Sequence, residues 1–211
     1  MPERTITFRE LFKNDKSSRP FFPTSIRVSL PRKSAQKQET RVVKRSRLFQ
    51  GSASHRGRLP FHVTFLKQKR EEIKVFADLG CALELGAPTT VDARKALGND
   101  AKVYAIDTYD VEFEDGKLRD NLLKKFTPLK HSISTSPLPF QCDAIRFANV
   151  SYYMSESDRR RAVYNIWKSL RAGGFLLGST QYFEGGKPVE HQFILKKTER
   201  GFVEVAFSKK Q

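Results

Sequence analysis

The chain has 211 residues and a formal net charge of +16, and this length suits one sizeable α/β domain with an extension. No window approaches the roughly 18 apolar residues of a membrane span, and the first residues lack the hydrophobic stretch of a signal peptide. Cys81 and Cys142 lie in separate apolar runs without histidines at metal-ligand spacing, so we expect buried thiols, no metal site and a cytoplasmic location.

The positive charge is concentrated in residues 1–70, which hold 18 Lys and Arg against 4 Asp and Glu, a net +14. Residues 71–211 carry only +2. Residues 19–47 mix prolines, serines and cations with few periodic apolar positions, which predicts a partly irregular segment. We therefore divide the chain into a basic N-terminal extension (1–70) and a folded domain (71–211).

A basic extension attracts anionic partners through its long-range field. Nucleic acid, an anionic membrane face and an acidic protein would all be drawn to it. The alternative is a solvated tail that only keeps the protein soluble, because no known nucleic-acid-binding motif accompanies the charge.

From residue 71 onward, short apolar runs alternate with amphipathic segments, which predicts alternating strands and helices. A proline-broken stretch, residues 134–141, interrupts the series. In chain order we predict a strand within 71–80, a helix over 89–98, a strand over 102–107, a helix over 115–126, a strand over 142–150, a helix over 155–174, a strand over 175–180 and a hairpin over 191–210.

The helix over 155–174 has the clearest pattern. A serine and an aspartate stand near its start, and the Gly173-Gly174 pair is a stop signal. Its apolar side chains recur at helical spacing as one stripe: Val163, Ile166, Trp167 and Leu170.

This order of elements predicts the fold class. Strands that alternate with helices form a parallel sheet covered on both faces, and the closing hairpin adds an antiparallel strand. We expect an α/β, doubly wound, mostly parallel sheet with an antiparallel edge strand.

In such a sheet the ligand site lies at the carboxyl ends of the strands. The polar or glycine residues just after the predicted strands are Asp78, Gly80, Gly86, Asp107 and Asn149. Glycines let a backbone approach a bulky ligand, and a helix amino end offers unpaired N–H donors. Asp107 stands 21 residues after Gly86, close to the roughly 20 expected for an acid that accepts hydrogen bonds from ribose hydroxyls. The spacing favours a ribosyl cofactor.

The glycine pattern argues against a dinucleotide. Nicotinamide and flavin enzymes carry GxGxxG, whereas here the glycines are spaced as GCALELG, and a P-loop is absent as well. A dinucleotide-dependent oxidoreductase is therefore disfavoured.

Three segments, in this order along the chain, resemble the class I S-adenosylmethionine-dependent methyltransferases. DLGCALELGAPTT (78–90) looks like their first motif, and YAID (104–107) looks like the second-strand acid that holds the ribose. Residues 136–179 are similar to the stretch that runs from an LPF turn to the glycine turn before strand five. The resemblance covers about residues 71–210 and implies a Rossmann-like, seven-stranded sheet with S-adenosyl-L-methionine as the cofactor.

The resemblance also implies roles for the candidate residues. Asp78, Gly80 and Gly86 would line the methionine and ribose side of the cofactor, Asp107 would bind the ribose hydroxyls, and Asn149 would close the pocket near the methionine.

The first motif departs from the family pattern of G-x-G directly after the strand. Here Ala82 takes the place of the second glycine, or a lengthened loop lets Gly86 serve. Ser134 and Thr135 lie about where the family places a polar residue near the adenine.

The implied activity is methyl transfer to an unidentified acceptor. An anionic acceptor would suit the cations of the extension. Because the cofactor carries the reactivity, no catalytic constellation is required, and we assign no catalytic residue. Tyr152 and Tyr153 are candidates to flank the acceptor. The alternative is a catalytically inactive methyltransferase-like protein that binds nucleic acid or an acidic partner through residues 1–70.

Overall fold

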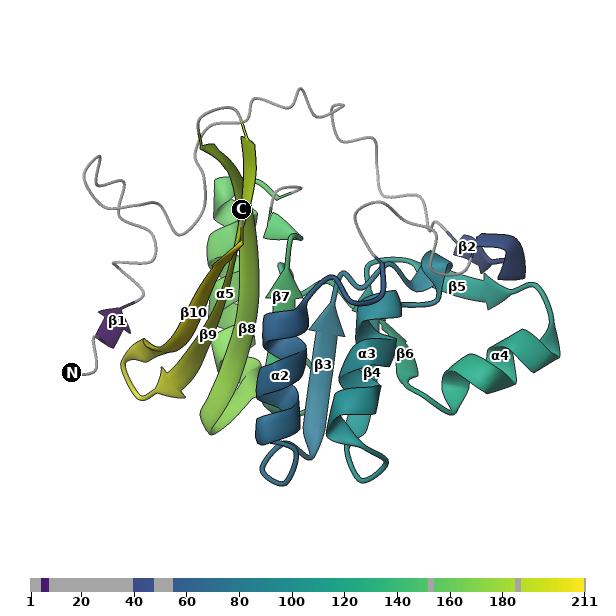
Figure 1. Cartoon of the computed structure of the whole chain (residues 1–211), viewed down its shortest axis with the longest axis horizontal. Coiled ribbons are helices and arrows are strands. Elements are labelled where there is room, and N and C mark those ends of the chain that lie inside the picture. Colours follow the sequence, from purple (N-terminus) through teal and green to yellow (C-terminus); the bar gives the residue numbers. More distant parts are fainter. Residues whose placement is uncertain (1–4, 8–39, 48–54, 152–153, 185–186, 211) are drawn as a thin grey trace.

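The computed structural model describes residues 5–7, 40–47, 55–151, 154–184 and 187–210 (Figure 1). Most of the predicted irregular segment and both Tyr152 and Tyr153 lie outside these residues. No helix in the described ranges has the length and apolar character needed to cross a membrane.

A mixed sheet forms the centre of the molecule, with strand order β1-β10-β9-β8-β7-β3-β4-β6. Strands β6, β4, β3, β7 and β8 are parallel, whereas β9 runs antiparallel to both of its neighbours, β8 and β10. The strands are β1 (Thr5–Thr7), β3 (Val75–Leu79), β4 (Lys102–Asp107), β6 (Thr127–Lys130), β7 (Cys142–Ala148), β8 (Leu170–Glu184), β9 (Lys187–Thr198) and β10 (Gly201–Lys210).

Helices cover both faces of this sheet. Helices α2 (Pro60–Gln68) and α3 (Pro88–Leu97) lie side by side on one face, and α5 (Glu156–Ser169) covers the other (Figure 1). The apolar side chains accordingly form two clusters. Phe65, Phe76 and Leu177 belong to the cluster under α2 and α3, and Ile145 and Ile166 belong to the cluster under α5.

A small second sheet lies beyond the β6 edge. Strand β2 (Thr40–Val43) pairs in parallel with β5 (Asp110–Phe113), close to α4 (Gly116–Leu123) (Figure 1). Val43 is buried in the core. Two short 3-10 turns, Arg45–Arg47 and Leu83–Leu85, complete the elements.

The predicted fold class is confirmed, including seven strands with an antiparallel C-terminal hairpin, to which the three-residue β1 is added at the β10 edge. Two details differ. The antiparallel β9 lies between β8 and β10 and is not an edge strand. Helix α5 ends at Ser169, since Leu170 is already extended and pairs with Cys142, so the glycine pair lies within β8.

Helix α2 falls inside the segment counted as the extension. It buries Phe65 and Leu66, and the ring of Phe65 meets Phe175 edge-on with centroids 5.0 Å apart. Some of the predicted extension therefore contributes to the core, while the division at residue 70 stays a prediction.

Candidate cofactor site

The loops that follow β3, β4 and β7 meet at the carboxyl edge of the sheet. The amide of Gly80, directly after β3, donates to the carbonyl of Ile106 on β4 at 2.8 Å. Gly80 has φ +65°, and a Cβ at this position would overlap the side chain of Val150, which follows β7. Glycine is thus required there both by the backbone conformation and by close packing.

The loop after β3 reverses the chain through several left-handed residues. Ala82 (φ 55°), Gly86 (φ 78°) and Ala87 (φ 48°) all have positive φ. The turn is closed by its own backbone, because the amides of Leu85 and Ala87 donate to the carbonyl of Ala82 at 3.0 and 3.2 Å. Both positions proposed for the second glycine therefore adopt the conformation that favours glycine.

Asp78 is buried, and protein donors surround its carboxylate. Thr90 and Thr89 on α3 donate hydroxyl hydrogens to Oδ2 at 2.6 and 3.1 Å. Arg146 on β7 makes a bidentate ion pair with it, with Nε at 2.8 Å from Oδ1. Asp78 thus joins the start of α3 to β7, and its predicted contact with the cofactor stays a prediction.

Asp107 ends β4 next to a second acid from the loop after β3. Its carboxylate accepts from the Thr108 amide at 3.0 Å and from the Tyr109 hydroxyl at 3.1 Å. The same hydroxyl contacts Glu84, which also binds Arg41 at 3.1 Å. Burial raises the pKa of Asp107, and the nearby charge of Glu84 adds to this effect.

Glu84 and Asp107 therefore face each other across one hydroxyl group. Two carboxylates that contact the same hydroxyl group are close enough together to accept hydrogen bonds from a diol, such as the 2′- and 3′-hydroxyls of a ribose. The Arg41 guanidinium lies 4.1 Å from the centre of the Tyr109 ring and covers it.

The loop after β6 adjoins the same site. The His131 amide donates to the carbonyl of Asp107 at 2.8 Å. Ser134 contacts the hydroxyl of Ser132 at 3.1 Å, and the Thr135 hydroxyl donates to the carbonyl of Ser132 at 2.7 Å. The start of this loop thus lies next to Asp107, whereas the Ser134 carbonyl accepts from Arg161 on α5 at 3.2 Å, and the predicted adenine position stays a prediction.

Asn149 follows β7 with φ 57°, a conformation that costs other residues more than asparagine. Its amide donates to the carbonyl of Ser179 at 3.3 Å, and its side-chain Nδ2 donates to Glu190 at 3.0 Å. Glu190 also lies 3.8 Å from Arg58. Asn149 therefore connects the end of β7 to β8 and β9, on the far side of β3 from the acid pair.

A layer of buried polar groups continues from Asn149 beneath the start of α2. His62 contacts the carbonyl of Gly178 at 3.0 Å through Nε2, so this nitrogen carries the proton. Burial, and then the charge of Arg146, lower the pKa of His62 to about 3, which keeps the ring neutral. Five atoms in this layer are buried without a hydrogen-bond partner among the described residues: His62 Nδ1, Arg146 Nη1, Asn149 Oδ1, Ser179 Oγ and Gln192 Oε1.

Sequence reasoning missed three residues of the site. Glu84 lies in the quoted loop but was not recognised as a second acid. Tyr109 belongs to no sequence motif that would mark it as a site residue. Arg146 did leave a signal, since a cation inside the apolar run CDAIRFA must find an anion when that strand is buried. No group of three or more His, Cys, Asp or Glu suited to a metal occurs within the part of the chain that the structure describes.

No protein-family model matches the chain, and the curated proteins include no significant match. Solved structures that are similar in fold include three methyltransferases, which differ in how much of each chain is aligned.

The first is the O-methyltransferase StiE, with 15% identity, 58% of this chain and 43% of that chain covered, and a TM-score of 0.43. The N-methyltransferase NodS of Bradyrhizobium japonicum WM9, in complex with S-adenosyl-L-homocysteine, gives 16% identity, 64% and 69% coverage, and a TM-score of 0.42. The sugar N-methyltransferase KedS8 of Streptoalloteichus sp ATCC 53650 gives 12% identity, 75% and 72% coverage, and a TM-score of 0.40.

The alignment thus spans less than half of StiE, and the identities are low in every case. The α/β fold class of the chain is given by its own order of strands and helices.

Proposed function

We propose that the protein is an S-adenosylmethionine-dependent methyltransferase that binds its cofactor at the carboxyl edge of β3 and β4. The observation that carries this proposal is the pair of carboxylates, Glu84 and Asp107, that face one hydroxyl beside the reversed loop after β3. Two further features support it: the exposed, left-handed Gly80 and the loop after β6 beside Asp107.

The residues present suit this cofactor. Glu84 and Asp107 would accept hydrogen bonds from the ribose hydroxyls, and the exposed backbone at Gly80 would allow close approach of the amino-acid part. The bound cofactor supplies an electrophilic methyl group, and the chain's task is to orient the acceptor and exclude water. No described residue is assigned as a catalytic base.

We place the acceptor on the Asn149 side of the site, above the buried polar layer. The ion pairs of this layer, Asp78–Arg146 and Glu190–Arg58, balance in charge, and His62 is neutral. An anionic acceptor would therefore owe its attraction to the cations of residues 1–70. We also propose a cytoplasmic location, because Cys81 and Cys142 are both free thiols.

Isothermal titration with S-adenosylmethionine and, separately, NAD tests the cofactor. We expect saturable binding of S-adenosylmethionine only, weakened at least about tenfold, or about 1.4 kcal/mol, by Asp107→Ala. Asp110→Ala is the matched control, since Asp110 is a nearby acid that pairs with Lys130 on the surface. The proposal fails if folded wild-type protein does not bind S-adenosylmethionine, or if both substitutions weaken binding equally.

A second candidate is an inactive methyltransferase-like protein that binds nucleic acid or an acidic partner. The observation that favours it is the loop after β3, where amides of Leu85, Gly86 and Ala87 are bonded within the loop itself. The titration distinguishes this candidate, because it requires that S-adenosylmethionine does not bind.

A further inference from the structure

A cationic pocket lies on the outer side of α3, away from the candidate cofactor site. Its volume is about 260 Å³, and its charged lining consists of Arg56, Arg94, Lys95 and Lys125. The pocket is next to the amino end of β4, since Arg94 binds the carbonyl of Ala101, the residue before that strand. Asp107 lies at the other end of the same strand.

Two of the four cations are held in place by the fold. Arg94 donates to the Ala101 carbonyl at 2.5 Å and to the Asn99 side chain at 3.5 Å. Arg56 binds Asp92 at 2.8 Å, and the second oxygen of that carboxylate accepts from the Gly57 amide at 2.6 Å. The carboxylate of Asp92 is thus already bound by Arg56 and by the backbone of Gly57.

The other two cations are not balanced. Neither Lys95 nor Lys125 has an ion-pair partner among the described residues, and the pocket lining contains no acid. Lys95 and Arg94 lie in the last turn of α3, where cations are favoured by the helix dipole. That effect does not account for Arg56 and Lys125, which reach the same pocket from outside the helix.

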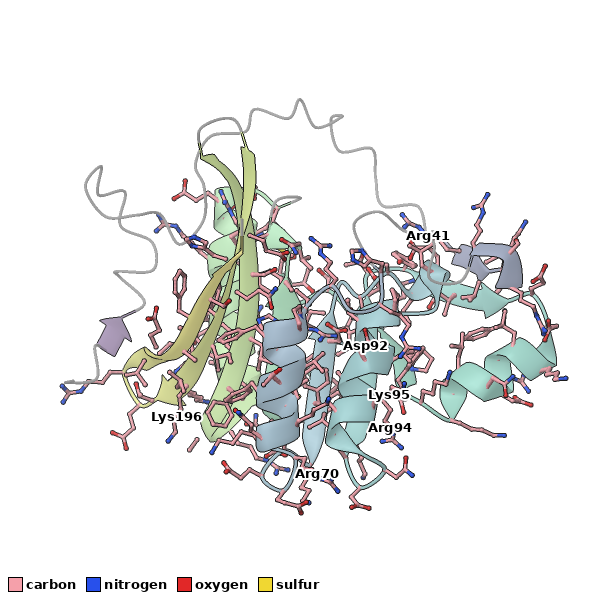
Figure 2. The ribbon with its side chains drawn as sticks, in the orientation of Figure 1. Arg41, Arg70, Asp92, Arg94, Lys95 and Lys196 are labelled. Atoms are coloured by element: carbon pink, nitrogen blue, oxygen red, sulfur yellow. The ribbon has the colours of Figure 1, made fainter. Side chains whose placement is uncertain are left out.

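A further cation, Arg70, lies beside the pocket. One of its terminal nitrogens, just after α2, is 4.0 Å from where a Cβ of Gly98 would stand. Its Nε binds Glu71 at 3.1 Å, and its side chain is 56% exposed. Figure 2 shows Arg94 and Lys95 on α3 and Arg70 below the neighbouring helix. Arg56 belongs to the segment that carries a net charge of +14.

We propose that this pocket binds a backbone phosphate of a single-stranded nucleic acid. A fixed guanidinium and two unbalanced ammonium groups in the lining of one pocket suit the oxygens of a phosphate. A polyanionic strand can contact the pocket and the neighbouring Arg70 at once, whereas a small anion would occupy the pocket alone. The proposal does not depend on methyl transfer.

The test is fluorescence anisotropy with a fluorescein-labelled RNA of mixed sequence, about 20 nucleotides long. The variant is Lys95→Ala/Lys125→Ala. Its matched control is Lys117→Ala/Lys196→Ala, which removes the same charge from two exposed lysines on α4 and β9. Thermal unfolding of each variant checks the fold.

We expect the wild type to bind the RNA and the pocket variant to bind it about tenfold more weakly, with the control close to the wild type. Because one single-strand phosphate contact contributes a slope of about −0.7, the salt dependence of the pocket variant should be shallower by about that amount.

Three outcomes would overturn the proposal. The wild type does not bind the RNA; the two variants lose equal affinity, which shows that only net charge matters; or a labelled polyglutamate peptide binds more tightly than the RNA and is the ligand that the pocket variant loses, which identifies an acidic protein segment instead.

Discussion

At the scale of single residues, the hydroxyl of Tyr109 occupies the place that the proposed function gives to ribose. One phenolic hydrogen lies between the carboxylates of Glu84 and Asp107. In Tyr109→Phe the ribose would no longer compete with the phenolic hydroxyl for the two carboxylates. We therefore expect S-adenosylmethionine to bind about fivefold more tightly, which corresponds to about 1 kcal/mol for one hydrogen bond. Titration measures the change, and Glu84→Gln should act in the opposite direction. Weaker binding by Tyr109→Phe would show that the hydroxyl helps to hold the cofactor.

The pair of Asp78 and Arg146 predicts a large loss of stability. Arg146 is fully buried, so Asp78→Ala would leave an uncompensated charge in the core. We expect the free energy of unfolding to fall by about 3–5 kcal/mol in a urea titration. The double variant Asp78→Leu/Arg146→Met removes both charges and should recover much of that loss. A loss below 1 kcal/mol, on the order of a surface pair, would contradict the buried pairing.

The left-handed alanine in the loop after β3 predicts a gain in stability. Ala82 has φ 55°, a conformation that costs roughly 1–2 kcal/mol for a residue with a Cβ. Ala82→Gly should therefore raise the free energy of unfolding by about 0.5–1 kcal/mol, after the entropy that glycine adds to the unfolded chain. The mirror control, Gly86→Ala, should lower it by a similar amount or more. Equal effects of the two substitutions would show that backbone conformation does not decide stability here.

At the scale of elements, helix α2 tests whether the segment before residue 70 is part of the fold. Leu66 is fully buried in the cluster under α2 and α3. Leu66→Ala should cost about 2–5 kcal/mol in urea unfolding, through lost burial and the cavity left behind. The control is Thr64→Ala on the exposed side of the same helix, expected within about 0.5 kcal/mol of the wild type. A small effect at Leu66 would mean that α2 is dispensable, as for a true extension.

Most elements of the domain were predictable because their periodicity is strong. Strand β4 was predicted with its observed bounds, and α5 buries Val163 and Ile166 from the predicted stripe. Strand β6 was missed because it has only four residues, contains Pro128 and pairs with one neighbour only, features typical of an edge strand.

The predicted end of α5, at Gly174, was wrong for a different reason. Glycine is a local stop signal, but Leu170 leaves the helix earlier because pairing with Cys142 and complete burial favour the extended form. Such a tertiary contact is not visible in local sequence. The same holds for the site: the position of Asp107 follows from strand order, whereas the approach of Glu84 to it depends on how the loop after β3 folds back.

At the scale of the whole molecule, the buried polar layer makes stability depend on pH. His62 is completely buried, and its pKa is lowered to about 3 by burial and by Arg146. In the unfolded chain a histidine binds a proton below about pH 6.5. Between these values the unfolded state holds the extra proton, so stability is fully present above pH 6.5 and is lost as the pH falls toward 3.

The expected slope for this one group is about 1.4 kcal/mol per pH unit well inside that window. Urea unfolding at several pH values from 7.5 down to 4.5 measures it. His62→Gln keeps a donor for the Gly178 carbonyl but cannot titrate, so its stability should fall less steeply over this range than that of the wild type. His55→Gln, at an exposed position, should leave the wild-type slope unchanged. Identical slopes for all three proteins would show that the layer admits a proton or water, and His62 would then be available to a ligand from the acceptor side.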